Sequence, residues 1–312
     1  MEFIRDLHNL HPGHQGCVVT IGNFDGVHLG HQAIIRQLQA SSTANNQPAV
    51  IVIFEPHPQE FLNPGRAPAR LMRLREKLVY LRQSGIDRVL CLRFEHALAS
   101  LPAEDFIRNI LVDKLGVRHL IVGDDFRFGN KREGDITTLT KSGKTFGFTL
   151  ECTATCKVDG QRISSSWVRE ALAAGDMARA EKLLGRPYAI NGRVVHGDKR
   201  GRELGYPTIN IDLHRLKSPV TGIYTARVQG LGSEPAEAVV SIGTRPMFGG
   251  KTINLEAHLL DFNRDVYGVY VTVELLKQLR KEEMFDTINK LKDQMKNDIA
   301  EAREFFQGRE QK

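Results

Sequence analysis

Residues 17–31 read CVVTIGNFDGVHLGH, a short β-branched run followed by three regularly spaced glycines and two histidines. The apolar run predicts a strand, the glycine-rich part a tight loop, and residues 32–39 a helix. The glycines let the backbone approach a ligand closely, and the amides that open a helix favour an anion. His28 and His31 lie three residues apart at this turn, so both can donate hydrogen bonds to phosphate oxygens. The stretch therefore predicts a phosphate-binding loop.

This loop differs from the two common glycine-rich signatures, Gly-x-Gly-x-x-Gly and Gly-x-x-x-x-Gly-Lys-Ser/Thr. Its His28-Leu29-Gly30-His31 segment resembles the His-x-x-His signature of the nucleotidyltransferase superfamily, in which the histidines bind ATP phosphates. A motif this short also occurs in solvated polar turns. Both interpretations stay open until the rest of the chain is considered.

Length and composition describe a globular protein with anionic ligands. The 312 residues suffice for two domains, and 41% hydrophobic and 26% charged residues are ordinary values. The net charge of +6 is spread along the chain, which suits a nucleotide as well as a nucleic acid. No stretch approaches the ~18 apolar residues of a membrane span, and residues 1–6 lack the apolar core of a signal peptide. We expect a cytoplasmic protein without a membrane partner.

The spacing of the cysteines and of the N-terminal histidines does not match the pattern of a metal site. The four cysteines have neither a disulfide-like spacing nor a second ligand pair, so we expect reduced, buried thiols. His8, His11 and His14 are evenly spaced, but Pro12 and Gly13 break any helix there. A polar loop is therefore the favoured interpretation of this region.

The first half of the chain alternates strands and helices. Strands are predicted at 49–54, 88–92, 119–122 and 148–152, and helices at 73–84 and 103–115. The run at 49–54 is apolar at consecutive positions, as in a parallel strand buried on both faces. This pattern predicts a doubly wound α/β domain with its ligand at the carboxyl ends of the strands.

The pattern changes after a predicted helix at 177–184. Short strand-like runs at 189–195, 222–228, 236–242, 252–260 and 267–275 are separated by turns, which predicts a small antiparallel barrel. A closing helix has core spacing at Phe285, Ile288, Leu291, Met295, Ile299 and Phe306. We therefore place the domains at 1–185 and 186–312.

Two further segments and one glutamate remain to be interpreted. The serines of 163–169 can cap a helix and, together with Arg169, can hold a triphosphate tail; these two roles are compatible. The glycine- and cation-rich residues 196–210 form either a solvated loop or one that wraps phosphates, with Thr208 and Asn210 supplying oxygen ligands to Mg²⁺. Glu256 lies in a strand pattern, where an outward-facing carboxylate is the common case.

The order of these motifs resembles one family, the bacterial bifunctional riboflavin kinase/FAD synthetase, over nearly the whole chain. The motifs are residues 22–31, 54–58, 123–129, 163–169, and 207–210 together with Glu256. The resemblance implies an N-terminal adenylyltransferase that joins FMN to the AMP of ATP with release of pyrophosphate. It also implies a C-terminal kinase that phosphorylates riboflavin, and Mg²⁺ with ATP at both sites.

The resemblance also assigns residues to the two sites. In the adenylyltransferase, His28 and His31 would bind ATP phosphates, and the nucleotide and pyrophosphate would contact Gly22, Asn23, Gly30, Ser164, Ser165 and Arg169. The flavin would lie against Phe54, His57, Pro58, Asp125 and Phe128. In the kinase, Glu256 would be the base, Thr208 and Asn210 the metal ligands, Gly197, Lys199 and Arg202 the phosphate loop, and Arg280 and Phe285 a flavin-side flap. Two positions depart from the family pattern, Ile209 for alanine and Ser166 for threonine, and neither removes a proposed functional group.

Two other functions fit parts of the sequence. A small relative of the class I aminoacyl-tRNA synthetases would share the His-x-x-His loop, but it needs a lysine-bearing second loop that this chain lacks. A nucleic-acid-binding barrel needs exposed stacking aromatics, and aromatic residues are only 7% of the chain. We therefore expect small-molecule substrates, no nucleic-acid partner, and a monomer or weak homo-oligomer.

Overall fold

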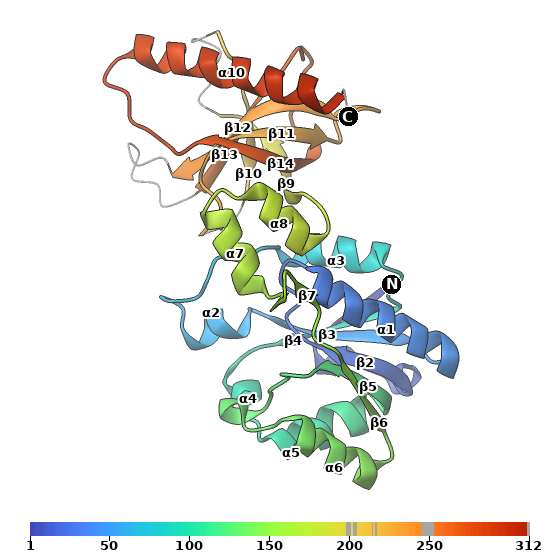
Figure 1. Cartoon of the computed structure of the whole chain (residues 1–312). Coiled ribbons are helices and arrows are strands. Elements are labelled where there is room, and N and C mark those ends of the chain that lie inside the picture. The colour runs from blue at the N-terminus through green and yellow to red at the C-terminus, as the bar shows by residue number, and fades with distance from the viewer. Residues whose placement is uncertain (198–200, 202–204, 214, 216, 245–252, 311–312) are drawn as a thin grey trace. The chain divides into compact units, whose positions relative to one another are not determined.

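The computed structural model describes residues 1–312 except 198–200, 202–204, 214, 216, 245–252 and 311–312. Its contacts divide the chain into two compact units, drawn in Figure 1. The first comprises Met1–Pro68 and Met72–Ser165, and the second comprises Ala69–Leu71 and Ser166–Lys312. The residues between 166 and 185 thus group with the second unit by their contacts, whereas the predicted functional boundary follows residue 185.

A six-stranded parallel sheet forms the centre of the first unit. Its strands are β1 (Glu2–Arg5), β2 (Cys17–Ile21), β3 (Ala49–Glu55), β4 (Arg88–Arg93), β5 (Val117–Gly123) and β6 (Thr149–Thr153). They lie in the order β1-β4-β3-β2-β5-β6, and each neighbouring pair is parallel. From β2 the chain adds β3 and β4 on one side and later β5 and β6 on the other. This confirms the doubly wound sheet and puts the switch point between β2 and β5.

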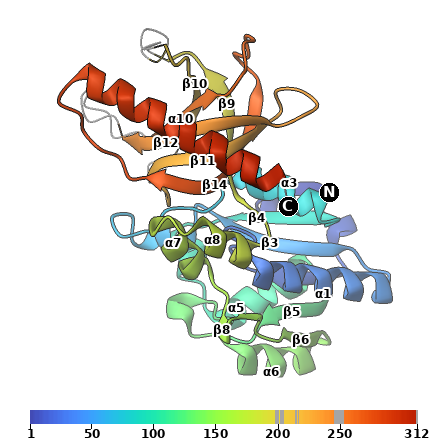
Figure 2. The same ribbon diagram turned by 45° about the horizontal axis from the view of Figure 1, so that its top comes forward.

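Helices cover both faces of this sheet (Figures 1 and 2). They are α1 (Leu29–Asn45), α2 (Pro58–Leu62), α3 (Leu74–Gln83), α4 (His96–Ala99), α5 (Ala103–Asp105), the π-helical η3 (Phe106–Lys114) and α6 (Ile136–Phe146). Short elements complete the unit: the 3₁₀ turns η1 (Leu7–Asn9), η2 (Pro12–His14) and η4 (Asn130–Arg132), and the hairpin β7 (Lys157–Val158) with β8 (Gln161–Arg162). Alternate strand residues enter two cores: Val19 and Val52 pack with η3, and Val18 and Ile51 with α1.

Strand β1 and helix α6 were not predicted, and neither were the short helices α2 and α4, the β7–β8 hairpin or the 3₁₀ turns. Strand β1 has only four residues, of which Ile4 alone is buried, so it carries almost no hydrophobic pattern. Helix α6 is threonine-rich and contains Gly143, which lowers its helix propensity. A tertiary contact explains the glycine. A Cβ atom at Gly143 would lie 2.7 Å from the Phe148 carbonyl oxygen, so glycine lets that backbone segment approach the helix closely. Local sequence alone could not show that contact.

A closed antiparallel barrel forms the second unit, as predicted. Its strands are β9 (Tyr188–Val195), β10 (Ile209–Asp212), β11 (Gly222–Gln229), β12 (Ala236–Thr244), β13 (Ile253–Leu259) and β14 (Tyr270–Arg280). They close in the order β10-β13-β12-β11-β14-β9. Burial alternates along β13, so Leu255 and Ala257 face the interior and Glu256 faces outward.

The helices of this unit that the described residues form are α7 (Ser165–Ala173), α8 (Met177–Leu184) and α10 (Ile288–Glu310). Helix α10 packs Ala302 and Phe306 against Leu260 and Leu276. The predicted core stripe is wrong at its start, because Phe285 precedes the helix and the Ile288 side chain is 65% exposed.

The cysteines and helices bear on two further expectations. All four cysteines are free, and burial raises the pKa of Cys17 to about 12 and that of Cys91 to about 11. The expectation of burial is wrong for Cys152, which is exposed. Among the described residues, no helix combines the length and hydropathy needed to cross a bilayer.

Candidate active sites

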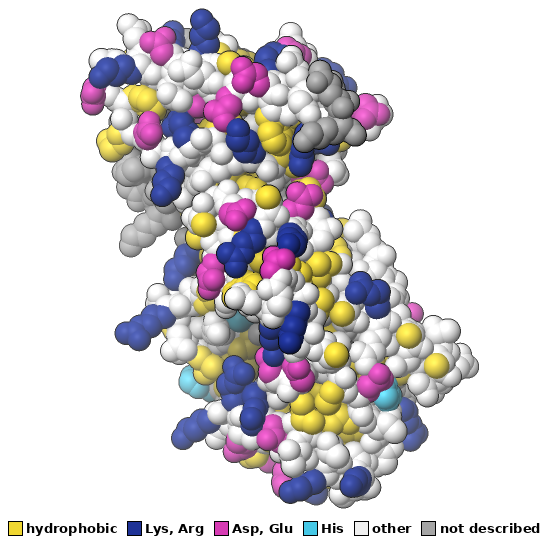
Figure 3. All heavy atoms as spheres, in the orientation of Figure 1, with side chains coloured by type: hydrophobic (Ala, Val, Ile, Leu, Met, Phe, Trp, Pro, Cys, Tyr) yellow, Lys and Arg dark blue, Asp and Glu magenta, His cyan; other side chains and the backbone are white. Residues whose placement is uncertain are grey.

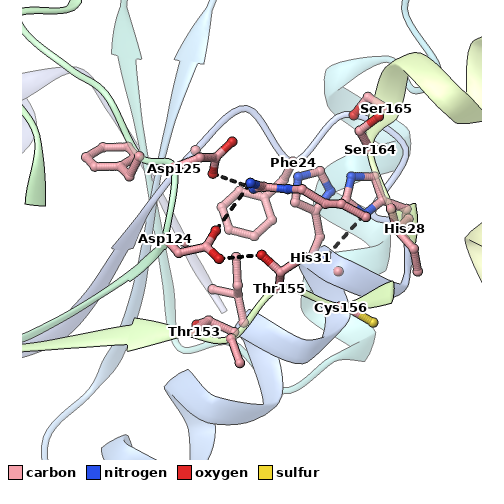
Figure 4. Close-up of a pocket in the computed structure, with 18 of the residues that line it drawn as sticks. Phe24, His28, His31, Asp124, Asp125, Thr153, Thr155, Cys156, Ser164 and Ser165 are labelled. Carbon is pink, nitrogen blue, oxygen red and sulfur yellow. Dashed lines mark hydrogen bonds and ion pairs between the residues drawn. The ribbon is translucent and has the colours of Figure 1, made fainter. Parts of the chain in front are cut away.

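A cavity of about 280 Å³ lies at the switch point of the parallel sheet. The ends of β2, β5 and β6 supply Ile21, Gly22, Gly123 and Thr153 to its lining. In Figure 4, His28 and His31 lie side by side near Ser164 and Ser165, across the cavity from Asp124 and Asp125. The structure therefore brings together the first, third and fourth sequence motifs.

His28 serves both as a helix cap and as a hydrogen-bond donor. It precedes α1, and its Nδ1 accepts the His31 backbone N–H at 3.3 Å. In the neutral ring the proton therefore belongs on Nε2, which becomes the donor. The His28 and His31 rings stack at 3.7 Å with an interplanar angle of 14°. Two charged imidazoles at that separation would repel each other, so at most one of the two rings carries a charge in this geometry.

Two buried polar atoms of the glycine loop have no hydrogen-bond partner among the described residues. They are Asn23 Oδ1 and His31 Nδ1. Burial, together with nearby His28 and Lys77, lowers the pKa of His31 well below its usual value of 6.5. Because buried polar groups are ordinarily paired, these two atoms indicate where a ligand completes the site.

Side chains far away in the sequence hold this loop in place. The buried Lys77 of α3 donates to the Asn23 carbonyl oxygen, and Asp25 Oδ1 accepts the Met72 backbone N–H at 3.0 Å. Ser165 Oγ donates to the Asp25 carbonyl oxygen at 2.9 Å. The loop is thus fixed before any ligand arrives, which lowers the ordering cost of binding.

Arg162 and Asp124 line the same cavity and were not predicted. Arg162 forms ion pairs with Asp124, at 3.2 Å, and with Asp125. Arg162 directly precedes the serine motif, and Asp124 precedes Asp125, so adjacency in the sequence was the available signal. The pairs join the β7–β8 hairpin to the end of β5.

The five predicted flavin residues occupy different places. Asp125 lines the cavity, next to Phe126. Phe128 is only 8% exposed and packs in the core with Phe106, at a ring distance of 5.7 Å. Phe54 lies near the end of β3 and packs edge-on against Phe94, with ring centres 5.8 Å apart.

His57 and Pro58 open helix α2, where His57 Nδ1 accepts the Gln59 backbone N–H at 3.2 Å. Like Phe54 and Phe128, they lie outside the cavity lining. The cavity therefore accounts for one of the five flavin residues, and the other four assignments stay predictions.

Residues of the serine motif up to Ser165 belong to the first unit, and those from Ser166 onward belong to the second. Ser164 and Ser165 line the cavity. Arg169 follows one turn into α7, and its Nε donates to the Ala69 carbonyl oxygen at 2.7 Å. The Arg70 and Leu71 carbonyl oxygens accept from Arg215 at 3.3 Å and from the Tyr188 hydroxyl at 3.1 Å.

The kinase candidates meet on the outer face of the barrel. Asn210 of β10 pairs directly with Glu256 of β13, and Glu256 pairs with Ser241 of β12. Directly opposed residues of antiparallel strands lie on one face with Cβ atoms ~5 Å apart. Thr208 lies two residues before Asn210, just ahead of the start of β10, while Ile211 is buried in the interior. Ser241 was not predicted, because only the strand register places it there.

The phosphate loop is partly described. Gly197 packs against Asn210 so closely that a Cβ atom would overlap its side chain. Lys199 and Arg202 lie outside the described residues. His258, two residues after Glu256, donates from Nδ1 to the Pro207 carbonyl oxygen at 2.9 Å and ties the end of this loop to β13.

One of the two flap residues, Arg280, is held by a carboxylate that the sequence did not single out. Arg280 forms a bidentate ion pair with Asp298 of α10, with Nε–Oδ1 and Nη2–Oδ2 distances of 2.9 Å. Asp298 is 4% exposed and also accepts from Gln294 at 2.9 Å. The Arg280 guanidinium lies 5.5 Å from the centre of the Phe285 ring. The last helix thus fixes the orientation of Arg280.

Comparisons with known proteins agree with this arrangement. The FAD synthetase family model matches residues 10–167, and the riboflavin kinase model matches residues 184–306. A bifunctional riboflavin kinase/FMN adenylyltransferase from Escherichia coli K12 is 50% identical over 98% of each chain. The chain belongs to this family. The sequence prediction of a two-domain enzyme, with the FAD synthetase part first, is confirmed.

Two further proteins match this chain over nearly its whole length. The family enzyme from Pseudomonas fluorescens is 48% identical over 97% of each chain. A crystal structure from Streptococcus pneumoniae, of a protein named macrolide-efflux protein, is 28% identical with a TM-score of 0.82. The match covers 97% of this chain and 99% of the Streptococcus pneumoniae chain, so the two proteins share the same two-part fold.

The lowered pKa of His31 predicts that acid destabilises the first unit. Folded His31 stays neutral where unfolded His31 takes up a proton, so the free energy of unfolding should fall as the pH drops below about 6.5. One such group contributes at most about 1.4 kcal/mol per pH unit. Urea unfolding between about pH 7 and pH 5 measures this slope. It should be flatter in His31→Gln and unchanged in the control His8→Gln; equal slopes in all three proteins would refute the assignment.

The contact at Gly197 predicts a kinase-specific defect. Gly197→Ala should displace Asn210 and lower kcat/KM for riboflavin phosphorylation by about 10-fold or more, since small displacements of positioning groups are costly. FMN adenylylation should not change. Gly308→Ala is the matched control, because nothing lies within 4 Å of its Cβ position. Full kinase activity in Gly197→Ala would remove this glycine from the site.

Proposed function

We propose that this chain makes FMN from riboflavin and then FAD from FMN, with residues 1–185 as the adenylyltransferase and residues 186–312 as the kinase. The observation that carries the adenylyltransferase assignment is the glycine loop. Its two unpartnered buried atoms, Asn23 Oδ1 and His31 Nδ1, belong to a loop that borders a cavity at the switch point of a doubly wound sheet.

In the adenylyltransferase, the FMN phosphate is itself a competent nucleophile. One of its oxygens attacks the α-phosphorus of ATP, a new P–O bond forms, and the bond to the β-phosphate breaks as pyrophosphate leaves. The protein aligns the two phosphates and offsets their charge. His28 donates from Nε2 and His31 contributes the single N–H of its neutral ring, while Gly22 and Gly30 allow close approach. Ser164, Ser165 and Arg169 hold the pyrophosphate.

The flavin of FMN lies against the side chains supplied by neighbouring strand ends. We assign this role to Phe54, His57, Pro58, Asp125 and Phe128. Asp125 is the member that lines the cavity, so it supports this assignment most directly.

In the kinase, the riboflavin hydroxyl is a poor nucleophile at neutral pH. Glu256 accepts its proton as the oxygen attacks the γ-phosphorus of ATP. The hydroxyl of Thr208 and the amide oxygen of Asn210 are hard oxygen donors beside this carboxylate, which suits Mg²⁺. When bound, Mg²⁺ offsets the charge of the ATP phosphates. Gly197, Lys199 and Arg202 wrap the phosphates, and Arg280 with Phe285 covers the flavin.

The proposed substrates also suggest the cellular location and the binding partners of this protein. We assign it to the cytoplasm, where ATP is available and its four free cysteines stay reduced. We further propose a monomer or weak homo-oligomer that binds small molecules and no nucleic acid. Lys and Arg side chains are interspersed with Asp and Glu on the face in Figure 3, which supports this choice.

Product chromatography tests the whole proposal. The purified protein is incubated with ATP and Mg²⁺ and either riboflavin or FMN. FMN and FAD should appear from riboflavin, FAD and pyrophosphate should appear from FMN, and EDTA should stop both reactions. FMN without FAD would refute the adenylyltransferase assignment, and no flavin product at all would refute both.

A further inference from the structure

We propose that Glu2, His11 and His14 form a binding site for one divalent transition-metal ion of the zinc class. Each offers one ligand atom, and the three atoms lie within 4.8 Å of one another. Two imidazoles and a carboxylate are a common zinc donor set that leaves a position for water. The site is independent of the flavin chemistry proposed above.

The distances suit a shared ion. His14 Nε2 lies 3.0 Å from Glu2 Oε1. Two ligands that each lie ~2.0–2.1 Å from one zinc ion are separated by roughly 3.3–3.4 Å at the tetrahedral angle, so this pair of atoms would have to move apart by only about 0.3 Å. The His11 ring lies against His14, with ring centres 3.6 Å apart and planes tilted by 36°. Small side-chain rotations would therefore suffice to complete the site.

The surrounding structure holds two of these ligands in place. His14 is 3% exposed, and its Nδ1 accepts the His11 backbone N–H at 3.2 Å. The Glu2 backbone N–H donates to the Asp87 carbonyl oxygen at 2.7 Å. Arg88 Nε lies 3.4 Å from Glu2 Oε2, which leaves Oε1 directed at His14. His11, with an exposed side chain, supplies the adaptable third ligand.

Binding has two identifiable costs. In the present hydrogen bond the proton of neutral His14 belongs on Nε2, so coordination there moves it to Nδ1 and breaks the contact with the His11 N–H. The Arg88 guanidinium also opposes a cation, although Glu2 offsets its charge. Losing one hydrogen bond is a small cost beside the free energy of binding zinc through several protein ligands, so a three-ligand site can tolerate it.

The position of the three residues indicates a structural role. Glu2 begins β1, and His14 ends the turn before β2, so both lie at the amino ends of the parallel strands. The nucleotide cavity lies at the carboxyl ends. A metal ion here would therefore fasten the edge strand β1 to the turn η2 and would not take part in catalysis. Two imidazole nitrogens also favour zinc-class ions over Mg²⁺.

Metal titration of the untagged protein of residues 1–312 tests this site. The protein is treated with EDTA, desalted and titrated with Co²⁺ while the visible spectrum is recorded, and Zn²⁺ is then used to displace Co²⁺. We expect one equivalent of Co²⁺, d–d bands of a low-coordinate site, and a higher thermal midpoint with Zn²⁺. His11→Ala and Glu2→Gln should each weaken binding at least tenfold.

Two controls make the result decisive. His8→Ala removes a nearby histidine whose side chain is 74% exposed and lies outside the cluster, so it should bind like the wild type. His11 and Glu2 are exposed, so their variants should fold, and circular dichroism of the metal-free proteins checks this. No Co²⁺ binding by the wild type, or equal binding by wild type, His11→Ala and Glu2→Gln, would overturn the proposal.

Discussion

Glu256→Gln is expected to lower the rate of FMN formation from riboflavin by about 10²–10⁴-fold, the usual effect of removing a general base. The amide keeps the size of the side chain and cannot accept the hydroxyl proton. FMN adenylylation should continue at the wild-type rate, because the described residues that line the cavity of the first unit include none from the barrel strands. Product chromatography with riboflavin or FMN as the starting flavin measures both activities in one protein.

The barrel itself provides a matched control for Glu256→Gln. Glu274 is a half-buried carboxylate on β14, three strands away from β13 in the closed six-strand order. Glu274→Gln should therefore leave riboflavin phosphorylation intact. If Glu256→Gln abolished both activities, the assignment of separate sites would be wrong. If it retained full kinase activity, Glu256 could not be the base.

The elements with strong periodic patterns were predictable from the sequence. Strand β3 is apolar at consecutive positions because both of its faces are covered, and helix α8 was predicted at the residues it occupies. The alternation in β13 and β10 also directs Glu256 and Asn210 outward, as expected from the sequence. Local patterns fixed these features because burial on a regular element repeats with its period.

The partners that complete the sites were not predictable. Lys77 reaches Asn23, Ser241 lies opposite Glu256, and Asp298 binds Arg280 only because distant elements pack together. A buried charge in a helix, such as Asp298, has no local signature that separates it from a solvated one. The cluster of Glu2 with His11 and His14 was missed for the same reason, since β1 was not expected to exist.

His28→Asn separates the two roles of His28 and should lower FMN adenylylation by about 10²–10³-fold, the cost of removing a positioned donor to developing charge. Asparagine is a good N-cap, so the side chain can still accept the His31 N–H and helix α1 should keep its stability. Its shorter amide cannot replace the Nε2 donor. His28→Ala should lose the same activity and, in addition, about 1 kcal/mol of stability.

The comparison of these two variants distinguishes catalysis from capping. If His28 were only a cap, His28→Asn would recover the activity that His28→Ala loses. If His28 binds phosphate, both variants would show the same large loss of FMN adenylylation while riboflavin phosphorylation stays at the wild-type rate. Asp176→Asn, at the N-cap of α8, where Asp176 accepts the Arg179 N–H at 2.9 Å, controls for cap exchange alone. Wild-type FAD output from His28→Asn would exclude the imidazole from the reaction, and the phosphate contacts would then fall to His31 and the loop amides.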